Sequence, residues 1–335
     1  MVTDATIERK LKASTAKVNR CINDLLEPRR PEVLYEAAKH IIASGGKRLR
    51  PYLVLKSCEL VGGDPDSAVP FAAAMEVLHN FTLIHDDIMD GDDLRRGVPT
   101  VHKLWGIPIG IASGDLLFTK VYQAMVEQAT KGVLPCDRVI TCIERVTDAN
   151  IAICEGQVLD ISFPSVVDVT EDDYLTMVGE KTSALFKACA EIGAIAGGGA
   201  PDEVVKLGSF AWDAGIAFQI IDDILGVIGD EETLGKPVGS DLREGKKTLI
   251  VIRALKCASP IERQAIERVL GVEGAMTSDI EAANKVLKST GGIDYARAKA
   301  WEYADMAEAT LSLFPESQAK RDLLELVDYF VKRNY

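Results

Sequence analysis

Five aspartates stand between residues 86 and 93, at the end of an apolar helical segment. Like charges at this density repel one another and raise one another's pKa. Acidic side chains at the C-terminal end of a helix also oppose the helix dipole. Because the sequence accepts both penalties, the segment indicates a functional site rather than ordinary surface.

Asp86 and Asp90 are four residues apart. On a helix their directions differ by about 40° and their Cβ atoms lie roughly 6 Å apart, so one divalent cation could bridge the two carboxylates. His79 comes seven residues before Asp86, about 20° away on the same helix face. We therefore expect this face to carry metal ligands, with a polar imidazole further along it.

A second acidic pair, Asp222 and Asp223, follows another apolar helical stretch. Two such helices on opposite walls of a bundle cavity could share metal ions through carboxylate oxygens. Mg²⁺ suits this arrangement, because it prefers a few carboxylates, several waters and substrate phosphates to a cage made only of protein. The two acidic pairs therefore predict Mg²⁺ and a diphosphate substrate.

Basic residues stand beside several predicted turns, and together they can form a local anion pocket. They are the cations of GGKRLRP (residues 45–51), Arg95, Arg96, Lys181 and Lys236. The chain as a whole has 38 Lys and Arg against 51 Asp and Glu, a net charge of −13. This balance disfavours general nucleic-acid binding but leaves a small phosphorylated substrate possible, since salt screens charges beyond roughly 8 Å.

The elements that must position these residues are predicted to be helices. Apolar residues recur at helical spacing throughout the chain, and the sustained alternation typical of strands is absent. Turn signals separate helices of about 12 to 25 residues. They lie at residues 28–31, 44–46, 62–66, 96–100, 197–201 and 235–239. No linker or repeat divides the chain, so we predict a single all-α domain over residues 1–335, a helical bundle around a central cavity.

The sequence also predicts a soluble, cytoplasmic protein. Its first residues, MVTDATIERKLKAS, lack the apolar core of a signal peptide. No run approaches the roughly 18 uninterrupted apolar residues of a membrane span. The seven cysteines form no CxxC pair, as expected for reduced thiols.

Five ordered segments resemble the motifs of the trans-isoprenyl diphosphate synthase family, in its short-chain geranylgeranyl and farnesyl diphosphate synthase branch. They are GGKRLRP, DDIMD with its following RRG, GEKTSALF, FQIIDDILG and GKPVGSDLREGKKT. The resemblance runs from about residue 40 to about residue 250. It implies an isoprenoid synthase fold, a homodimer and a prenyltransferase that joins isopentenyl diphosphate to allylic diphosphates of five to fifteen carbons (C5–C15).

The resemblance assigns a role to each matched polar residue. Three Mg²⁺ ions would be held against the allylic diphosphate by Asp86, Asp90 and Asp222. Carboxylates behind these ligands would be Asp87 and Asp223. The anion shell of the same diphosphate would be completed by Arg95, Lys181 and Lys236. Isopentenyl diphosphate would lie in a metal-free site formed by Lys47, Arg50, His79 and Arg96.

The implied reaction starts with ionisation of the allylic diphosphate to a carbocation. The isopentenyl double bond attacks this cation, and the released diphosphate takes the proton lost in the last step. Oxygen dipoles near the cation would come from Thr182 and Gln219. The cavity lining would include Gln157 and Asp160.

One position departs from the family pattern. The second aspartate-rich motif is usually written DDxxD, and its fifth position here is Gly226. We expect either that the tail of this motif contributes less to metal binding or that Asp230 substitutes for the missing carboxylate.

The resemblance implies that product length depends on the residues just before the first aspartate-rich motif, Phe81 and Thr82. Two bulky aromatic residues there would limit the cavity near C15. With one aromatic and one small residue, we predict mainly the C20 product, geranylgeranyl diphosphate. The small Thr82, about 40° from Asp86 on the helix, is the better candidate for the floor.

Three alternatives remain open. A farnesyl diphosphate synthase would stop at C15. A terpene cyclase would share the fold and the first acidic motif, but it would not need the second diphosphate site that GGKRLRP and RRG suggest. A non-catalytic subunit of a heteromeric synthase would typically lack the acidic motifs.

Overall fold

The computed structural model describes residues 4–228, 240–272 and 274–332, and nearly all of these residues are helical. The strands found in these ranges are β1 (Leu94–Arg95) and β2 (Val98–Pro99), a short antiparallel pair in which Arg95 faces Val98. The predicted all-α fold is therefore confirmed. Five of the six predicted turns lie at junctions between elements; 28–31 and 44–46 lie wholly outside the helices, whereas 62–66, 96–100 and 197–201 overlap an element or its end. The sixth, 235–239, is outside the described residues.

The chain divides into two compact units, each assembled from separate stretches of sequence. Unit 1 comprises Met1–Asp148, Leu185–Gly208 and Leu311–Leu326. Unit 2 comprises Ala149–Ala184, Ser209–Thr310 and Val327–Tyr335. That the whole chain is one domain stays a prediction.

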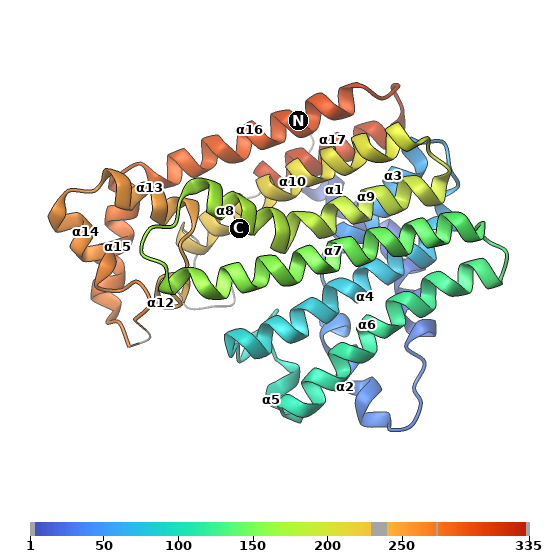
Figure 1. Cartoon of the computed structure of the whole chain (residues 1–335), viewed down its shortest axis with the longest axis horizontal. Coiled ribbons are helices and arrows are strands. Elements are labelled where there is room, and N and C mark those ends of the chain that lie inside the picture. Colours follow the sequence, from blue (N-terminus) through green and yellow to red (C-terminus); the bar gives the residue numbers. More distant parts are fainter. Residues whose placement is uncertain (1–3, 229–239, 273, 333–335) are drawn as a thin grey trace. The chain divides into compact units, whose positions relative to one another are not determined.

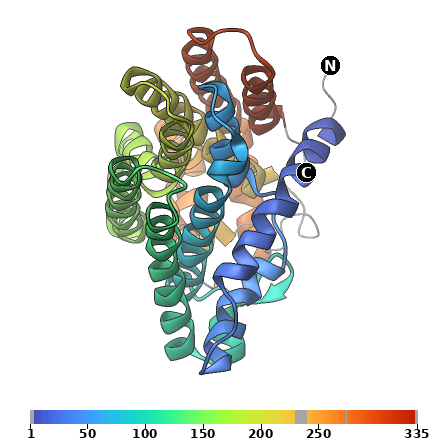
Figure 2. The same ribbon diagram turned by 90° about the vertical axis from the view of Figure 1, so that its right-hand side faces the viewer.

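Unit 1 is built around α4, which packs against α1, α3 and α6 (Figures 1 and 2). Its elements are α1 (Asp4–Leu25), α2 (Glu32–Ala43), α3 (Leu49–Leu60), α4 (Pro65–Asp90), β1, β2, α5 (Val101–Trp105) and α6 (Ile107–Thr130). The middle of α4 is buried on nearly every side, because small alanines and apolar side chains alternate there without a polar face.

The ends of α4 follow from local sequence. Asp64 caps the N-terminus by accepting a hydrogen bond from the backbone N–H of Asp66, and Pro65 occupies the first helical position. Gly91 ends the helix in the left-handed conformation, with φ of 70°. Asp86 and Asp90 consequently lie in the last turns of α4.

Unit 2 contains most of the second half of the chain. Its own elements are η1 (Phe163–Ser165), α8 (Glu171–Val178), the π-helical turn η2 (Gly179–Ser183), α12 (Ser240–Arg243), α13 (Leu249–Cys257), α14 (Pro260–Glu267) and α15 (Thr277–Ser289). Helices that supply residues to both units are α7 (Cys136–Ser162), α9 (Ala184–Gly197), α10 (Pro201–Ile228), α16 (Gly292–Ser312) and α17 (Gln318–Lys332).

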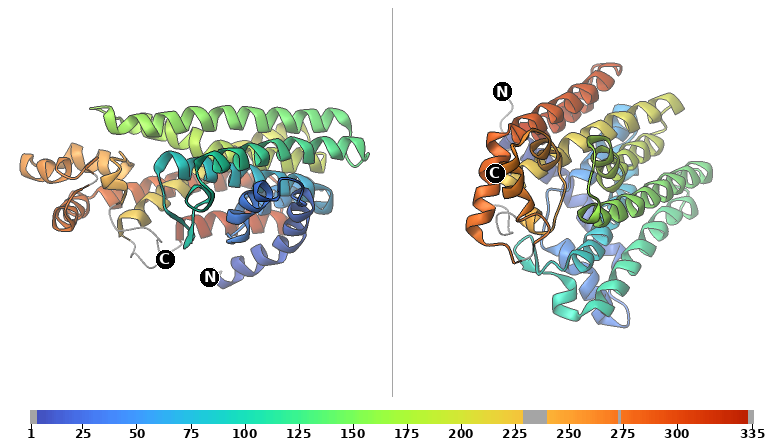
Figure 3. Two further views of the ribbon diagram at one scale, coloured as in Figure 1. Left: turned by 90° about the horizontal axis from the view of Figure 1, so that it is seen from below. Right: turned by 60° about the vertical axis from the view of Figure 1, so that its left-hand side comes forward.

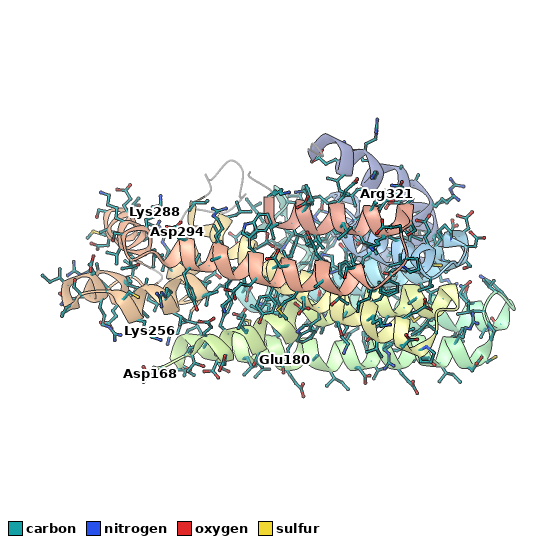
Figure 4. The ribbon with its side chains drawn as sticks, turned by 90° about the horizontal axis from the view of Figure 1, so that it is seen from above. Asp168, Glu180, Lys256, Lys288, Asp294 and Arg321 are labelled. Carbon is teal, nitrogen blue, oxygen red and sulfur yellow. The ribbon has the colours of Figure 1, made fainter. Side chains whose placement is uncertain are left out.

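Within unit 2, α14 and α15 lie side by side, as the left view of Figure 3 shows. Figure 4 labels Lys288 near the end of α15 and Asp294 near the start of α16. Gly291, with φ of 74°, makes the turn between these two helices.

Two helices in the described part of the chain, α4 and α10, have the length and mean hydropathy of a membrane span. In each of them 61% of the apolar window is buried inside the structure. Core helices of soluble proteins share these properties, so the two helices are weak grounds for a membrane span.

Candidate active site

The first acidic cluster lies at the C-terminal end of α4 in unit 1. Asp86 and Asp90 are partly buried, whereas Asp87 between them is 1% exposed. All three side chains offer carboxylate oxygens, the donors that Mg²⁺ prefers. The cluster therefore suits a hard cation that keeps some of its waters.

Arg95 is held by this cluster. Its Nε donates to Asp87 Oδ1 at 2.6 Å, and its Nη2 contacts Asp92 Oδ2 at 3.2 Å. Burial raises the pKa of Asp87, while the charge and hydrogen bonds of Arg95 oppose that rise. Arg95 thus has two carboxylate partners as well as its predicted role toward the allylic diphosphate, and the second acidic residue of the motif is a buried ion-pair partner.

The four residues predicted to bind isopentenyl diphosphate all lie in unit 1, and three of them are close enough to interact electrostatically. Burial lowers the pKa of His79 well below its usual value, and the positive charges of Arg50, Arg96, Arg95 and Arg48 add to this effect. The guanidinium of Arg50 stacks over the ring of Phe186 at 4.6 Å. Lys47 is exposed, as a residue that meets a substrate should be. The neutral imidazole of His79 can offer hydrogen bonds here without adding charge.

The low pKa of His79 predicts a pH-dependent contribution to stability. In the unfolded chain the imidazole binds its proton near pH 6.5, whereas the folded chain resists protonation at that pH. The contribution is therefore fully present above pH 6.5 and is lost as the pH falls below it. We expect the stability advantage of wild type over His79→Gln to shrink by up to about 1.4 kcal/mol per pH unit in that window.

Urea unfolding at a series of pH values between about 7.5 and 5.5 measures this difference. His102→Gln is the matched control, because His102 is a partly buried histidine on α5 whose Nδ1 contacts the hydroxyl of Thr100 at 3.2 Å. A difference between wild type and His79→Gln that stays constant with pH would contradict the prediction.

The second acidic pair lies in unit 2 on α10, within a buried hydrogen-bond chain. Tyr174 donates from its hydroxyl to Asp223 Oδ2 at 2.7 Å, and Gln219 donates from Nε2 to Asp223 Oδ1 at 2.9 Å. Thr182 donates to Gln219 Oε1 at 3.0 Å. Burial raises the pKa of Asp223 to about 7, Asp241 and Asp222 add to that rise, and the two hydrogen bonds oppose it. Thr182 and Gln219, predicted as neighbours of the cation, are thus in contact and oriented by Asp223.

Sequence reasoning missed Tyr174. It is fully buried and donates to the acidic motif from 49 residues away. A tyrosine in an amphipathic helix gives no local sign that its hydroxyl bonds to a distant carboxylate.

The GEKTS segment forms the π-helical turn η2, which contains Lys181 and Thr182. Such turns are frequent at functional sites. Lys181 forms an ion pair with Asp160 of α7, which joins two predicted site residues. Gly156 permits this close approach, because a Cβ at that position would lie 2.3 Å from the backbone N of Lys181. Gln157 follows on the same helix, partly buried.

At Gly226, where the family motif usually has an aspartate, the structure places the carboxylate of another residue. A Cβ built on Gly226 would lie 2.8 Å from Oδ2 of Asp241, so this carboxylate occupies the space beside the glycine. Asp241 lies within the GKPVGSDLREGKKT segment but was not singled out from the sequence. Burial opposes the charge of Lys246, yet Asp241 and Glu244 raise the pKa of this lysine above its usual value. Asp230 and Lys236 lie outside the described residues.

The predicted floor residues lie among aromatic rings in unit 1. The ring of Phe81 contacts His85 at 4.8 Å and Phe118 of α6 at 5.2 Å, and Phe118 contacts Tyr122 at 5.2 Å. Thr82 donates its hydroxyl to the backbone carbonyl of His79 at 2.8 Å. The α6 aromatics were missed from the sequence, although their spacing of four residues places them on one helix face.

Comparison with known proteins gives the family of this chain. The sequence profile of the family described as Polyprenyl synthetase matches residues 31–287. The chain belongs to this family. It is 43% identical to a geranylgeranyl diphosphate synthase of Saccharolobus solfataricus over 90% of this chain and 91% of that protein. A crystal structure of geranylgeranyl pyrophosphate synthetase from Pyrococcus horikoshii superposes with a TM-score of 0.91, at 41% identity over 98% of each chain.

Overall identity does not fix product length within the polyprenyl synthetases. A geranylfarnesyl diphosphate synthase of Aeropyrum pernix is 41% identical over 90% of this chain and 95% of that protein. A protein named for a longer product is thus nearly as similar as those named for geranylgeranyl diphosphate. The length of the prenyl product must therefore be inferred from the residues of the site.

In this polyprenyl synthetase the donor chemistry fits Mg²⁺. Among the residues that the structure describes, no group of three or more His, Cys, Asp or Glu side chains is arranged to hold a metal by itself. Asp87 also carries a buried Oδ2 atom that makes no hydrogen bond within those residues. This unsatisfied carboxylate oxygen beside Asp86 is of the donor type that Mg²⁺ prefers.

Proposed function

We propose that this chain is a Mg²⁺-dependent trans-prenyltransferase that condenses isopentenyl diphosphate with C5–C15 allylic diphosphates and yields mainly geranylgeranyl diphosphate. The observation that carries the proposal is in unit 1, where carboxylates on the last turns of α4 adjoin an arginine cluster around the neutral His79. On this proposal one helix would present metal ligands and, two turns earlier, an anion site without metal. The names of the relatives support the same activity.

In the proposed reaction three Mg²⁺ ions would be held by Asp86, Asp90 and Asp222. These ions would supply positive charge that stabilises the departing diphosphate. Lys181 and Lys236 would add cations to the same anion. Thr182 and Gln219, oriented by Asp223, would direct oxygen dipoles toward the allylic cation, because their hydrogen-bond chain fixes which lone pairs remain available.

Lys47, Arg50, His79 and Arg96 would bind the diphosphate of isopentenyl diphosphate and aim its double bond at the cation. No side chain is needed as the final base, because the released diphosphate accepts the proton. These residues therefore bind and orient rather than transfer protons.

A product assay tests this function directly. The enzyme is supplied with Mg²⁺, isopentenyl diphosphate and, in separate reactions, C5, C10 and C15 allylic diphosphates. We expect elongation of all three primers, with C20 as the main final length. Accumulation of C15 would identify a farnesyl diphosphate synthase. Cyclised hydrocarbon without use of isopentenyl diphosphate would indicate a cyclase, and complete inactivity of the pure chain would indicate a partner-dependent subunit.

Thr82→Phe is expected to shorten the product from C20 toward C15. Thr82 is small and partly buried, and a phenyl group beside Phe81 would place two aromatic rings where the growing chain is proposed to run. Chromatography of the dephosphorylated products measures the change. Thr119→Phe, an exposed position on α6, is the matched control and should leave the C20 product unchanged. A Thr82→Phe enzyme with wild-type products would place the floor elsewhere, for example at Leu78 or Met75.

We further propose a soluble, cytoplasmic homodimer that binds no nucleic acid. Exposed aliphatic side chains support the dimer, because Ile151 and Val158 lie seven residues apart on one face of α7 and Ile107 and Ile111 lie four apart on α6. The burial of the two apolar windows supports solubility. The net charge of −13 disfavours polyanionic partners. Light scattering during gel filtration measures the number of chains in solution.

A further inference from the structure

Two arginines in unit 1 share an unusual backbone conformation. In the described ranges, Arg48 and Arg96 are the non-glycine residues with positive φ, at 54° and 55°. Side chains other than glycine rarely adopt this conformation, so the surrounding structure must hold it. Both guanidinium groups donate to the same atom, the carbonyl oxygen of Gly45. Two strained residues, 48 positions apart in the sequence, thus converge on one turn.

Arg48 is buried, at 5% exposure, and its guanidinium group donates hydrogen bonds to several acceptors. Its Nη1 donates to Gly45 O at 3.0 Å and to Glu76 Oε1 at 2.7 Å. Its Nη2 donates to Ile42 O at 2.8 Å, and its Nε donates to Asn19 Oδ1 at 3.2 Å. The side chain therefore ties the turn after α2 to α1 and α4.

Glu76 supplies the counter-charge from the interior of α4. It is 2% exposed, and Asn80 one turn later donates to its Oε1 at 3.3 Å. A buried ion pair of this kind is a poor source of stability, because desolvation offsets its attraction and apolar residues of similar size often do as well. What apolar residues cannot supply is the directed set of hydrogen bonds to Gly45, Ile42 and Asn19.

These bonds hold the backbone that precedes Arg48 against its side chain, and α3 begins directly after Arg48. Lys47 immediately precedes it and is exposed. Arg48 is also the N-cap residue of α3, so Arg50 lies in the first turn of the helix that starts there. On the far side of the turn, a Cβ on Gly46 would lie 3.1 Å from the guanidinium of Arg96. Three of the four proposed isopentenyl diphosphate ligands thus flank or touch the segment that Arg48 holds.

We propose that Arg48 and Glu76 are a positioning pair that sets the geometry of Lys47, Arg50 and Arg96 for the diphosphate of the homoallylic substrate. The inference rests on the proposed function, which assigns those three cations to isopentenyl diphosphate. Arg48 itself is buried behind the turn and acts through its neighbours.

The decisive variant is the double substitution Arg48→Met with Glu76→Leu. It removes both charges together, so no uncompensated charge stays buried and the fold is kept. We expect calorimetry to show isopentenyl diphosphate binding weakened at least tenfold, with a melting temperature within about 5 °C of wild type. Steady-state kinetics should show KM for isopentenyl diphosphate raised by a similar factor, while KM for the C15 allylic diphosphate stays within twofold.

Asp322→Asn is the matched control for loss of a buried ion pair. Asp322 is 3% exposed and pairs with Lys10 at 2.8 Å and Lys56 at 2.9 Å, and none of these three residues is a hydrogen-bond partner that the structure gives Arg48. We expect this variant to melt at a lower temperature and to bind isopentenyl diphosphate as wild type does. Arg48→Lys provides a second test if the double variant does not fold, because lysine keeps the charge but cannot serve all the acceptors. It should also weaken binding at least tenfold.

A folded double variant, or a folded Arg48→Lys variant, that binds isopentenyl diphosphate with wild-type affinity would overturn the inference. Equal changes in the two KM values would overturn it too, since they would indicate a general structural effect. Wild-type turnover is measured alongside. Loss of the proposed function would appear as an inactive wild type, whereas failure of this inference would appear in the variants of an active enzyme.

Discussion

Asp86→Ala should lower kcat by about a thousandfold, which equals roughly 4 kcal/mol of transition-state stabilisation. Asp86 would hold Mg²⁺, which would supply positive charge to the departing diphosphate, and a water molecule in its place would lack the negative charge of the carboxylate. The fold should survive, because the substitution removes one of several crowded negative charges at the C-terminal end of α4, where they oppose the helix dipole. Turnover with saturating Mg²⁺, together with circular dichroism and a melting curve, measures both effects.

Asp93→Ala is the matched control for this variant. Asp93 belongs to the same acidic cluster, but it is exposed and pairs with Lys103 at 2.6 Å. It should therefore retain wild-type turnover. An Asp86→Ala enzyme with near wild-type activity in Mg²⁺ would show that the ions are held by other residues.

Asp222→Asn should lower kcat about a hundredfold, whereas Gly226→Asp should leave it within a few-fold. Asp222 is proposed as the metal ligand of the second acidic motif. The carboxylate of Asp241 already occupies the space beside Gly226, and its flexible side chain can move aside for a new one. A carboxylate introduced at position 226 would therefore take the place of the Asp241 carboxylate, so the negative charge near this position would change little.

Kinetics of these two variants at several Mg²⁺ concentrations separate the possible outcomes. The Asp222→Asn enzyme should need more Mg²⁺ for half-maximal rate, and the Gly226→Asp enzyme should not. Gly226→Ala is the steric control, because it adds the Cβ without the charge. Equal losses in Asp222→Asn and Gly226→Asp would contradict the assignment of the motif to Asp222.

The helices, most of the turns and the family could be predicted from the amino-acid sequence. Helical periodicity and turn residues are local signals, and they predicted the all-α fold and five turns that the described chain contains. The acidic residues, too, could be placed at the end of a helix, because Gly91 supplies the stop signal immediately after Asp90. The inferences about helices, turns and the helix end depend on residues within a few positions of one another, whereas the family was inferred from the order of five motifs along the chain.

The contacts between side chains that are distant in the sequence depend on the tertiary structure. Arg95 pairs with Asp87, and Asp241 lies beside Gly226; both contacts depend on how the chain bends after a helix ends. The positions of Tyr174 at Asp223 and of Phe118 at Phe81 depend on which faces of two helices meet. Helix propensity does not predict such contacts, because the same periodic pattern of apolar residues is compatible with many different neighbouring helices.

Arg48 illustrates the difference between what the sequence predicts and what the tertiary structure adds. In the sequence it is one of three cations in GGKRLRP, and nothing in the spacing separates it from Lys47 and Arg50. In the structure it is the most buried of the three, at 5% exposure, because Glu76 offers a buried counter-charge and the carbonyls of Ile42 and Gly45 accept hydrogen bonds from its guanidinium. The sequence determined that this segment is basic, and tertiary packing decided which charge supports the others.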